Sequence, residues 1–185
     1  MTNAGPEKRS AYGKPVLIHI HVPKCSGSSV NALVSRKFGT RAVSFDHPDI
    51  KKILQEKDNR FRDENFDCFF GHTTANLDDL FDRPVIKFSI MRDPIDRICS
   101  FFNYIHMTPA HPLHSALRER LPTLDAMADG VFEDIDHLEA NWCNYFCRAY
   151  SGKAVRTVSE FAAARASILR EIEDGRLVVG GQGPH

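Results

Sequence analysis

Seven consecutive residues, Pro23-Lys-Cys-Ser-Gly-Ser-Ser29, have the side chains best suited to anion binding in this sequence. Gly27 and the small residues around it leave room for backbone N–H groups to point inward, and Lys24 adds a mobile positive charge. The hydroxyls of Ser28 and Ser29 are further hydrogen-bond donors. This run therefore predicts a site for phosphate or sulfate. The alternative is that its serines do no more than cap a helix.

The sequence on either side places this run between a strand and a helix. Residues 16–20 form an apolar run that suits a buried strand and is too short to span a membrane. Residues 30–38 have the apolar spacing of an amphipathic helix. A helix N-terminus offers free N–H groups and the positive end of the helix dipole. We expect the N–H groups of residues 25–29 to surround the bound anion.

A second pair of polar residues, Arg92 and Ser100, predicts another anion site. Arg92 follows the strand expected at 84–91. Asp93 is a suitable N-cap and Pro94 a suitable first residue for the next helix, which carries Ser100 two turns from its start. A guanidinium group can donate two parallel hydrogen bonds to phosphate oxygens. The alternative is an arginine that pairs with a surface carboxylate beside an ordinary helical serine.

The two motifs together resemble those of sulfotransferases of the carbohydrate branch that use PAPS, 3′-phosphoadenosine 5′-phosphosulfate. The order P-K-x-x-G-[ST]-[ST] resembles their 5′-phosphosulfate loop, and R-D-P-x-x-R-x-x-S resembles their 3′-phosphate-binding segment. Cys25 stands in place of the usual threonine and Ser26 in place of a glycine or alanine. The resemblance implies that PAPS is bound by Lys24, Cys25, Ser26, Gly27, Ser28, Ser29, Arg92 and Ser100.

The dipeptide Gly71-His72 is similar to the G-H segment of the heparan sulfate 2-O-sulfotransferase branch. The histidine of that segment is the proposed base, which an alcohol acceptor needs because it is a poor nucleophile. The resemblance thus implies two catalytic residues: His72 takes the acceptor's proton, and Lys24 stabilises charge on the leaving group. The implied acceptor is a hydroxyl group, that of a saccharide.

The other histidines do not predict a metal site. His19 and His21 share one face of the strand at 16–20, and we interpret them as buried or sheet-face residues, with His21 the next candidate for the base. Three prolines make the segment 107–122 irregular, and we interpret the histidines in or beside it as substrate-side or solvated: His106, His111 and His114. No cysteine or carboxylate completes a metal-ligand spacing, and sulfuryl transfer needs no metal.

Strands alternate with helices along the chain. Strands are expected at 16–20, 66–70, 84–91 and 176–179, a helical turn at 77–81, and helices at 30–38, 49–57, 94–106, 138–150 and 159–173. This pattern predicts an α/β, P-loop-like fold of three layers, in which helices flank a mainly parallel central sheet. Ligands in such folds bind at the carboxyl ends of the strands. We expect a flexible tail at 1–14 and a single domain at 15–185.

The composition is that of an ordinary globular protein, with 42% hydrophobic and 26% charged residues. A formal net charge of zero favours neither nucleic acid nor a membrane surface as a partner. No apolar run is long enough for a membrane-spanning helix. The five cysteines include no C-x-x-C pair, which favours free thiols in a reducing, cytoplasmic compartment.

Two other functions compete with sulfuryl transfer. A P-loop nucleotide kinase or NTPase shares the strand–loop–helix unit, although G-x-x-x-x-G-K-[ST] is absent from the sequence. A nucleotide-binding protein that has lost turnover would keep the same motifs. The sequence leaves this last function open.

The strand expected at 176–179 lies close to the end of the sequence, which bears on what covers its two faces. Residues 177–180 resemble a V-V-G segment after which family members continue for several tens of residues, whereas this sequence stops at residue 185. A parallel strand usually needs cover on both faces. We expect a natural minimal version, a chain that lacks a C-terminal segment, or a homo-oligomer in which a second subunit supplies the cover.

Overall fold

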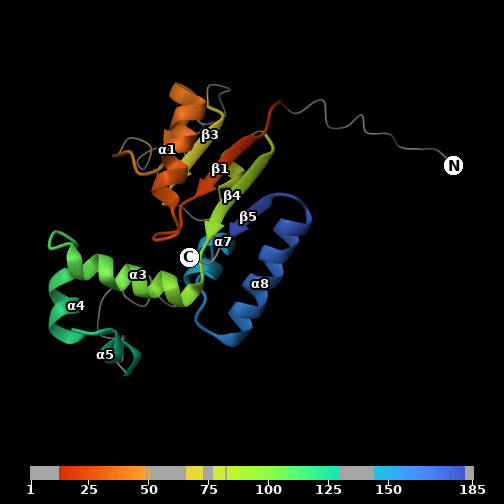
Figure 1. The fold of residues 1–185 in the computed structure, drawn as a ribbon. Coiled ribbons are helices and arrows are strands. Elements are labelled where there is room, and N and C mark those ends of the chain that lie inside the picture. Colours follow the sequence, from red (N-terminus) through yellow and green to blue (C-terminus); the bar gives the residue numbers. More distant parts are fainter. Residues whose placement is uncertain are drawn as a thin grey trace.

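A five-stranded parallel sheet forms the centre of the computed structural model (Figure 1), which describes residues 13–48, 50, 66–72, 77–81, 83–129 and 144–181. The strands lie in the order β2-β3-β1-β4-β5 and all pair in parallel. Their bounds are β1 Val16–Ile20, β2 Ala42–Ser44, β3 Cys68–Gly71, β4 Val85–Met91 and β5 Leu177–Gly181. The predicted α/β fold with a parallel sheet flanked by helices is confirmed.

The helices flank this sheet and extend beyond one end of it. Their bounds are α1 Gly27–Phe38, α3 Pro94–Met107, α4 His114–Arg120, α5 Leu124–Asp129, α7 Tyr145–Ser151 and α8 Val158–Glu173. Short 3-10 turns lie at Gly39–Arg41 and Asp78–Leu80. Figure 1 shows α1 along one side of the sheet, α8 along the other, and α3 to α5 beyond the carboxyl ends of the strands.

The alternation of β1 shows which helix covers which face of the sheet. Ile18 and Ile20 are fully buried and belong to the same core cluster as Tyr150 of α7. His19 and His21 point to the opposite face, where both contact Asn31 of α1. Helices α1 and α7 therefore cover opposite faces, which gives the sheet a helical layer on each side.

The strand order creates a crevice next to β1. After β1 the chain runs to β2 and β3 on one side of it, and then crosses to β4 and β5 on the other side. The carboxyl ends of β1 and β4 thus flank the topological switch point, where parallel α/β sheets bind their ligands. The strand order alone places the candidate site at this edge.

Helix α4 corrects the expectation of an irregular segment at 107–122. The Nδ1 atom of His114 lies 2.8 Å from the carbonyl oxygen of Ile105, and Nε2 of His106 lies 3.1 Å from that of Leu121. These two half-buried histidines thus fasten α4 to α3, which the sequence did not indicate. The prediction was wrong because all three prolines lie outside α4, two before it and one after it.

Other element bounds agree with the expected ones or differ from them in smaller ways. Helix α1 begins at Gly27 instead of residue 30, and β2 was not expected at all. Helix α3 begins at Pro94, after an Asp93 cap whose carboxylate accepts hydrogen bonds from the N–H groups of Ile95 and Asp96. The helix expected at 49–57 falls almost wholly outside the described residues. Residues 138–143 of the helix expected at 138–150 also fall outside them.

Candidate active site

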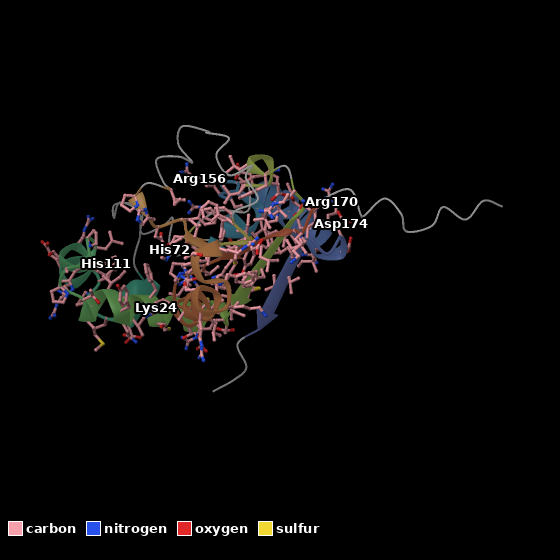
Figure 2. The ribbon with its side chains drawn as sticks, turned by 90° about the horizontal axis from the view of Figure 1, so that it is seen from above. Lys24, His72, His111, Arg156, Arg170 and Asp174 are labelled. Carbon is pink, nitrogen blue, oxygen red and sulfur yellow. The ribbon has the colours of Figure 1, made fainter. Side chains whose placement is uncertain are left out.

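All five parallel strands end at one edge of the sheet, and four of these ends are followed by a polar side chain. Lys24 follows β1, Asp46 follows β2, His72 follows β3 and Arg92 follows β4. A cavity of about 670 Å³ opens at this edge. Its lining includes seven of the predicted site residues: Lys24, Ser26, Gly27, Ser28, His72, Arg92 and Ser100. Figure 2 shows Lys24 and His72 on the same side of the molecule.

The loop after β1 is held in an unusual backbone conformation. Lys24 and Ser26 have φ angles of 67° and 59°, in the left-handed region that residues other than glycine seldom adopt. Such strain, of the order of 1 kcal/mol or more per residue, clusters at ligand-binding sites. Ser26 is the N-cap of α1 but makes no side-chain capping bond. This argues against the interpretation that the serine here only caps the helix.

Two predicted loop residues do not present their side chains to the cavity. The Cys25 thiol is 1% exposed, and burial in the core raises its pKa. The N–H group of Cys25 donates to the Val22 carbonyl at 3.3 Å, and that of Ser29 to the Ser26 carbonyl at 3.1 Å. The expectation that all N–H groups of 25–29 face the anion is therefore wrong at both ends.

Gly27 and Ser28 remain as the backbone donors of the loop. They begin α1, and the first N–H groups of a helix have no acceptor within the helix. A Cβ atom on Gly27 would lie 1.8 Å from Cδ2 of His21, so only glycine lets this imidazole pack against the start of the helix. The loop, the glycine and the imidazole form one close-packed unit.

The ammonium group of Lys24 lies over an aromatic ring. Its Nζ atom is 4.5 Å from the ring centroid of Tyr104 in α3, which is cation–π distance. Tyr104 lines the same cavity, opposite the loop. The ring therefore holds the lysine at the cavity wall, where it can reach an anion in the loop.

Arg92 has a donor that lacks a partner. Its Nε atom is buried and makes no hydrogen bond, although it forms a loose ion pair with the exposed carboxylate of Asp96 at 3.9 Å, as the alternative interpretation expected. Buried donors are rarely left unsatisfied, so such a group indicates a missing acceptor. Ser100, two turns along α3, lines the same cavity. The arginine and the serine together suit a phosphate group.

Arg97, the second arginine of the same motif, has a different environment. It is 1% exposed, and its guanidinium lies over the ring of Tyr145 at 4.3 Å and near Phe146 at 5.7 Å. Burial lowers its pKa. Because Arg97 is packed against aromatic rings of α7, it ties α3 to the rest of the molecule.

His72 is paired with a carboxylate that the sequence did not indicate. Its Nδ1 atom lies 3.2 Å from each carboxylate oxygen of Asp46. A Cβ atom on Gly71 would lie 2.8 Å from Oδ2 of Asp46, and Gly71 has a φ of 133°. Asp46 can accept a hydrogen bond from the Nδ1–H group of His72, which in the neutral tautomer leaves the lone pair on Nε2 for proton abstraction. The only local signal was the position of Asp46 after β2, a three-residue strand that was itself not expected.

Two further histidines lie behind His72. The rings of His21 and His72 stack with centroids 4.4 Å apart, and Asn31 makes a hydrogen bond to both His19 and His21. Burial lowers the pKa of both His19 and His21. His19 is a buried, hydrogen-bonded residue, as expected, whereas His21 lines the cavity.

The fold and the cavity are those of a parallel α/β protein with a strand–loop–helix unit at the switch point of its sheet. The family model of the sulfotransferases matches residues 12–131, which include both motifs and the strands β1 to β4. The chain belongs to the sulfotransferase family, and its chemistry is therefore sulfuryl transfer in general. No curated protein and no solved structure gives a significant match.

The described residues contain neither a metal-binding cluster nor a membrane-spanning helix. In that part of the chain, no three His, Cys, Asp or Glu side chains gather as a metal ion's ligands would. No helix there is long and apolar enough to cross a membrane.

Proposed function

We propose that this protein transfers a sulfuryl group from PAPS to a hydroxyl group of a saccharide, as in the heparan sulfate 2-O-sulfotransferase branch. One observation carries the proposal: the strained loop after β1 and Arg92, which follows β4, line one cavity. PAPS has an anionic group at each end of its ribose. A site with two separate sets of hydrogen-bond donors for anions suits such a ligand better than a site with a single phosphate-binding loop.

The donor would lie with its phosphosulfate at the loop. The N–H groups of Gly27 and Ser28, together with the Lys24 ammonium, would bind that group, while Arg92 and Ser100 would bind the 3′-phosphate. The 5′ and 3′ groups would thus lie at the ends of β1 and β4, which are neighbours in the sheet. Cys25 and Ser29 would support the loop through their backbone bonds.

The proposed reaction is a single in-line displacement at sulfur. The acceptor oxygen forms a bond to sulfur as the bond between sulfur and the bridging oxygen breaks. The bridging oxygen keeps the electron pair and leaves with adenosine 3′,5′-bisphosphate. The acceptor's proton passes to Nε2 of His72, whose developing positive charge Asp46 stabilises at 3.2 Å. Lys24 stabilises the negative charge on the leaving group.

The assignment of PAPS as the sulfuryl donor is tested first, by comparing how strongly different nucleotides stabilise the protein. Melting temperatures are measured with adenosine 3′,5′-bisphosphate, ATP and ADP, and the bisphosphate at 100 times its Kd should stabilise the protein by about 2.7 kcal/mol. Equal protection by ATP would favour a nucleotide kinase or NTPase. Transfer from radiolabelled PAPS to desulfated heparan saccharides then tests the reaction. Binding without transfer to any saccharide would indicate a nucleotide-binding protein without turnover.

The cytoplasmic location and the single domain at 15–185 stay predictions from the sequence. The four cysteines in the described part of the chain are free thiols. A homo-oligomer is also proposed, because β5 is an edge strand of the sheet. Light scattering of the purified protein would decide between a monomer and an oligomer.

A further inference from the structure

His21 occupies a position between the loop and the proposed base. Its Cδ2–Nε2 edge faces Gly27 so closely that a Cβ atom there would lie 2.2 Å from Nε2. Its ring face stacks on His72, with the centroids 4.4 Å apart. The mechanism above gives His21 no role, although it lines the cavity where the sulfuryl group would be transferred.

Asn31 determines which nitrogen of His21 carries the proton. The Nδ2 atom of Asn31 lies 3.2 Å from Nδ1 of His21, and its Oδ1 atom lies 2.7 Å from Nδ1 of His19. An amide nitrogen only donates and an amide oxygen only accepts. His19 therefore donates from Nδ1, while His21 accepts at Nδ1. A neutral His21 must then carry its proton on Nε2, the atom next to Gly27.

His21 also stays neutral. Burial lowers the pKa of His21 to about 4, with further lowering by His72 and His19, while Asp46 acts in the opposite direction. A neutral donor suits this position for a second reason. When His72 takes the acceptor's proton it becomes a cation, and a second cation stacked at 4.4 Å would oppose that step.

We propose that His21 is a neutral hydrogen-bond donor, whose Nε2–H group binds an oxygen of the sulfuryl group as it is transferred. Asn31 is a positioning residue whose amide, in the orientation of the structure, fixes the tautomer of His21 and also bonds to the buried His19. The inference rests on the proposed function for the identity of the anion. The tautomer itself does not depend on that function.

The tautomer is tested without substrate by nitrogen NMR of protein labelled at histidine. The wild-type His21 should show a protonated Nε2 and an unprotonated Nδ1 at neutral pH. Asn31→Asp keeps the shape of the side chain but replaces its donor by an acceptor, so the His21 proton should move to Nδ1. A wild-type spectrum with the proton on Nδ1 overturns the proposal, whether or not the protein turns over PAPS.

Kinetics of three variants test the role of the donor. His21→Phe keeps the stacked ring and removes the N–H group, and kcat should fall about 10²–10³-fold, as for other oxyanion donors. Asn31→Asp should lower kcat similarly, whereas His21→Gln, which retains an amide N–H, should recover part of the loss. Affinity for adenosine 3′,5′-bisphosphate, which has no sulfuryl group, should not change in any of them. Melting temperatures identify a variant that fails to fold.

The outcomes separate this inference from the proposed function. A wild-type protein that binds the bisphosphate but transfers no sulfuryl group contradicts the proposed function. The NMR experiment still shows which nitrogen of His21 carries the proton in that case. Active wild-type protein with a His21→Phe variant of equal kcat overturns the donor role. A loss of bisphosphate affinity equal to the loss of kcat would also overturn it, because His21 would then contact the nucleotide.

Discussion

Replacing Arg92 by alanine should weaken the binding of a 3′-phosphate without weakening the fold. Arg92 lines the cavity and is paired only loosely with Asp96, at 3.9 Å, so a phosphate could bind its guanidinium group without breaking a short protein hydrogen bond at Nε. Hydrogen bonds to charged groups contribute about 1.5–3 kcal/mol, which corresponds to about a 10- to 150-fold loss of affinity. The ligand-free variant should unfold at the same temperature as the wild type or higher, because an unsatisfied buried donor is removed.

The assay compares two ligands that differ only in the 3′-phosphate. Calorimetry with adenosine 3′,5′-bisphosphate should show the full loss in Arg92→Ala, while adenosine 5′-monophosphate should bind the variant and the wild type alike. Arg36→Ala, on the exposed face of α1, is the matched control for the loss of one positive charge. If Arg92→Ala weakened both ligands equally, or neither, Arg92 would not bind the 3′-phosphate.

Three further predictions concern the rest of the site. In a steady-state kinetic assay, His72→Ala should lower kcat by about 10²–10⁴-fold. Asp46→Asn should lower kcat by only about fivefold, because an exposed ion pair contributes about 1 kcal/mol or less. Equal losses of kcat in the two variants would contradict this. Gly27→Ala must displace the imidazole that packs against it, and denaturant unfolding should show a loss of about 1–3 kcal/mol. Arg97→Ala should destabilise the fold by about 2 kcal/mol or more, through its lost contacts with aromatic rings, and calorimetry should find the bisphosphate affinity unchanged.

The strands at 16–20 and 84–91, and the meeting of the two motifs that follow them, could be predicted because their signals are local. The run at 16–20 and the run at 84–91 are apolar over their whole length, and each is followed at once by polar or small residues. Asp93 and Pro94 mark the start of α3 unambiguously. Since the carboxyl ends of parallel strands meet at one edge, these local signals were enough to bring Lys24 and Arg92 to the same cavity.

The parts that could not be predicted depend on contacts between distant segments. Asp46 reaches His72 across 26 positions of sequence, after a strand too short to show a pattern. Asn31 looks like an ordinary polar residue of an amphipathic helix until α1 is placed over the face that carries His19 and His21. Helix α4 is held to α3 by two histidines that bond to carbonyl groups, which no periodicity indicates.

The short strand β2 makes part of the site less stable than the sheet that supports it. It has three residues, each only partly buried, and it lies at the edge of the sheet with β3 as its single neighbour, so Phe45, buried directly after it, is the main anchor of the segment that carries Asp46. Edge segments with few buried contacts open locally before the whole molecule unfolds. When β2 frays, Asp46 leaves His72 while the loop after β1 and Arg92, on the central strands, stay in place. Warming should therefore uncouple the base from its carboxylate before nucleotide binding is lost, and the protein should pass through a state that still binds its donor but reacts slowly.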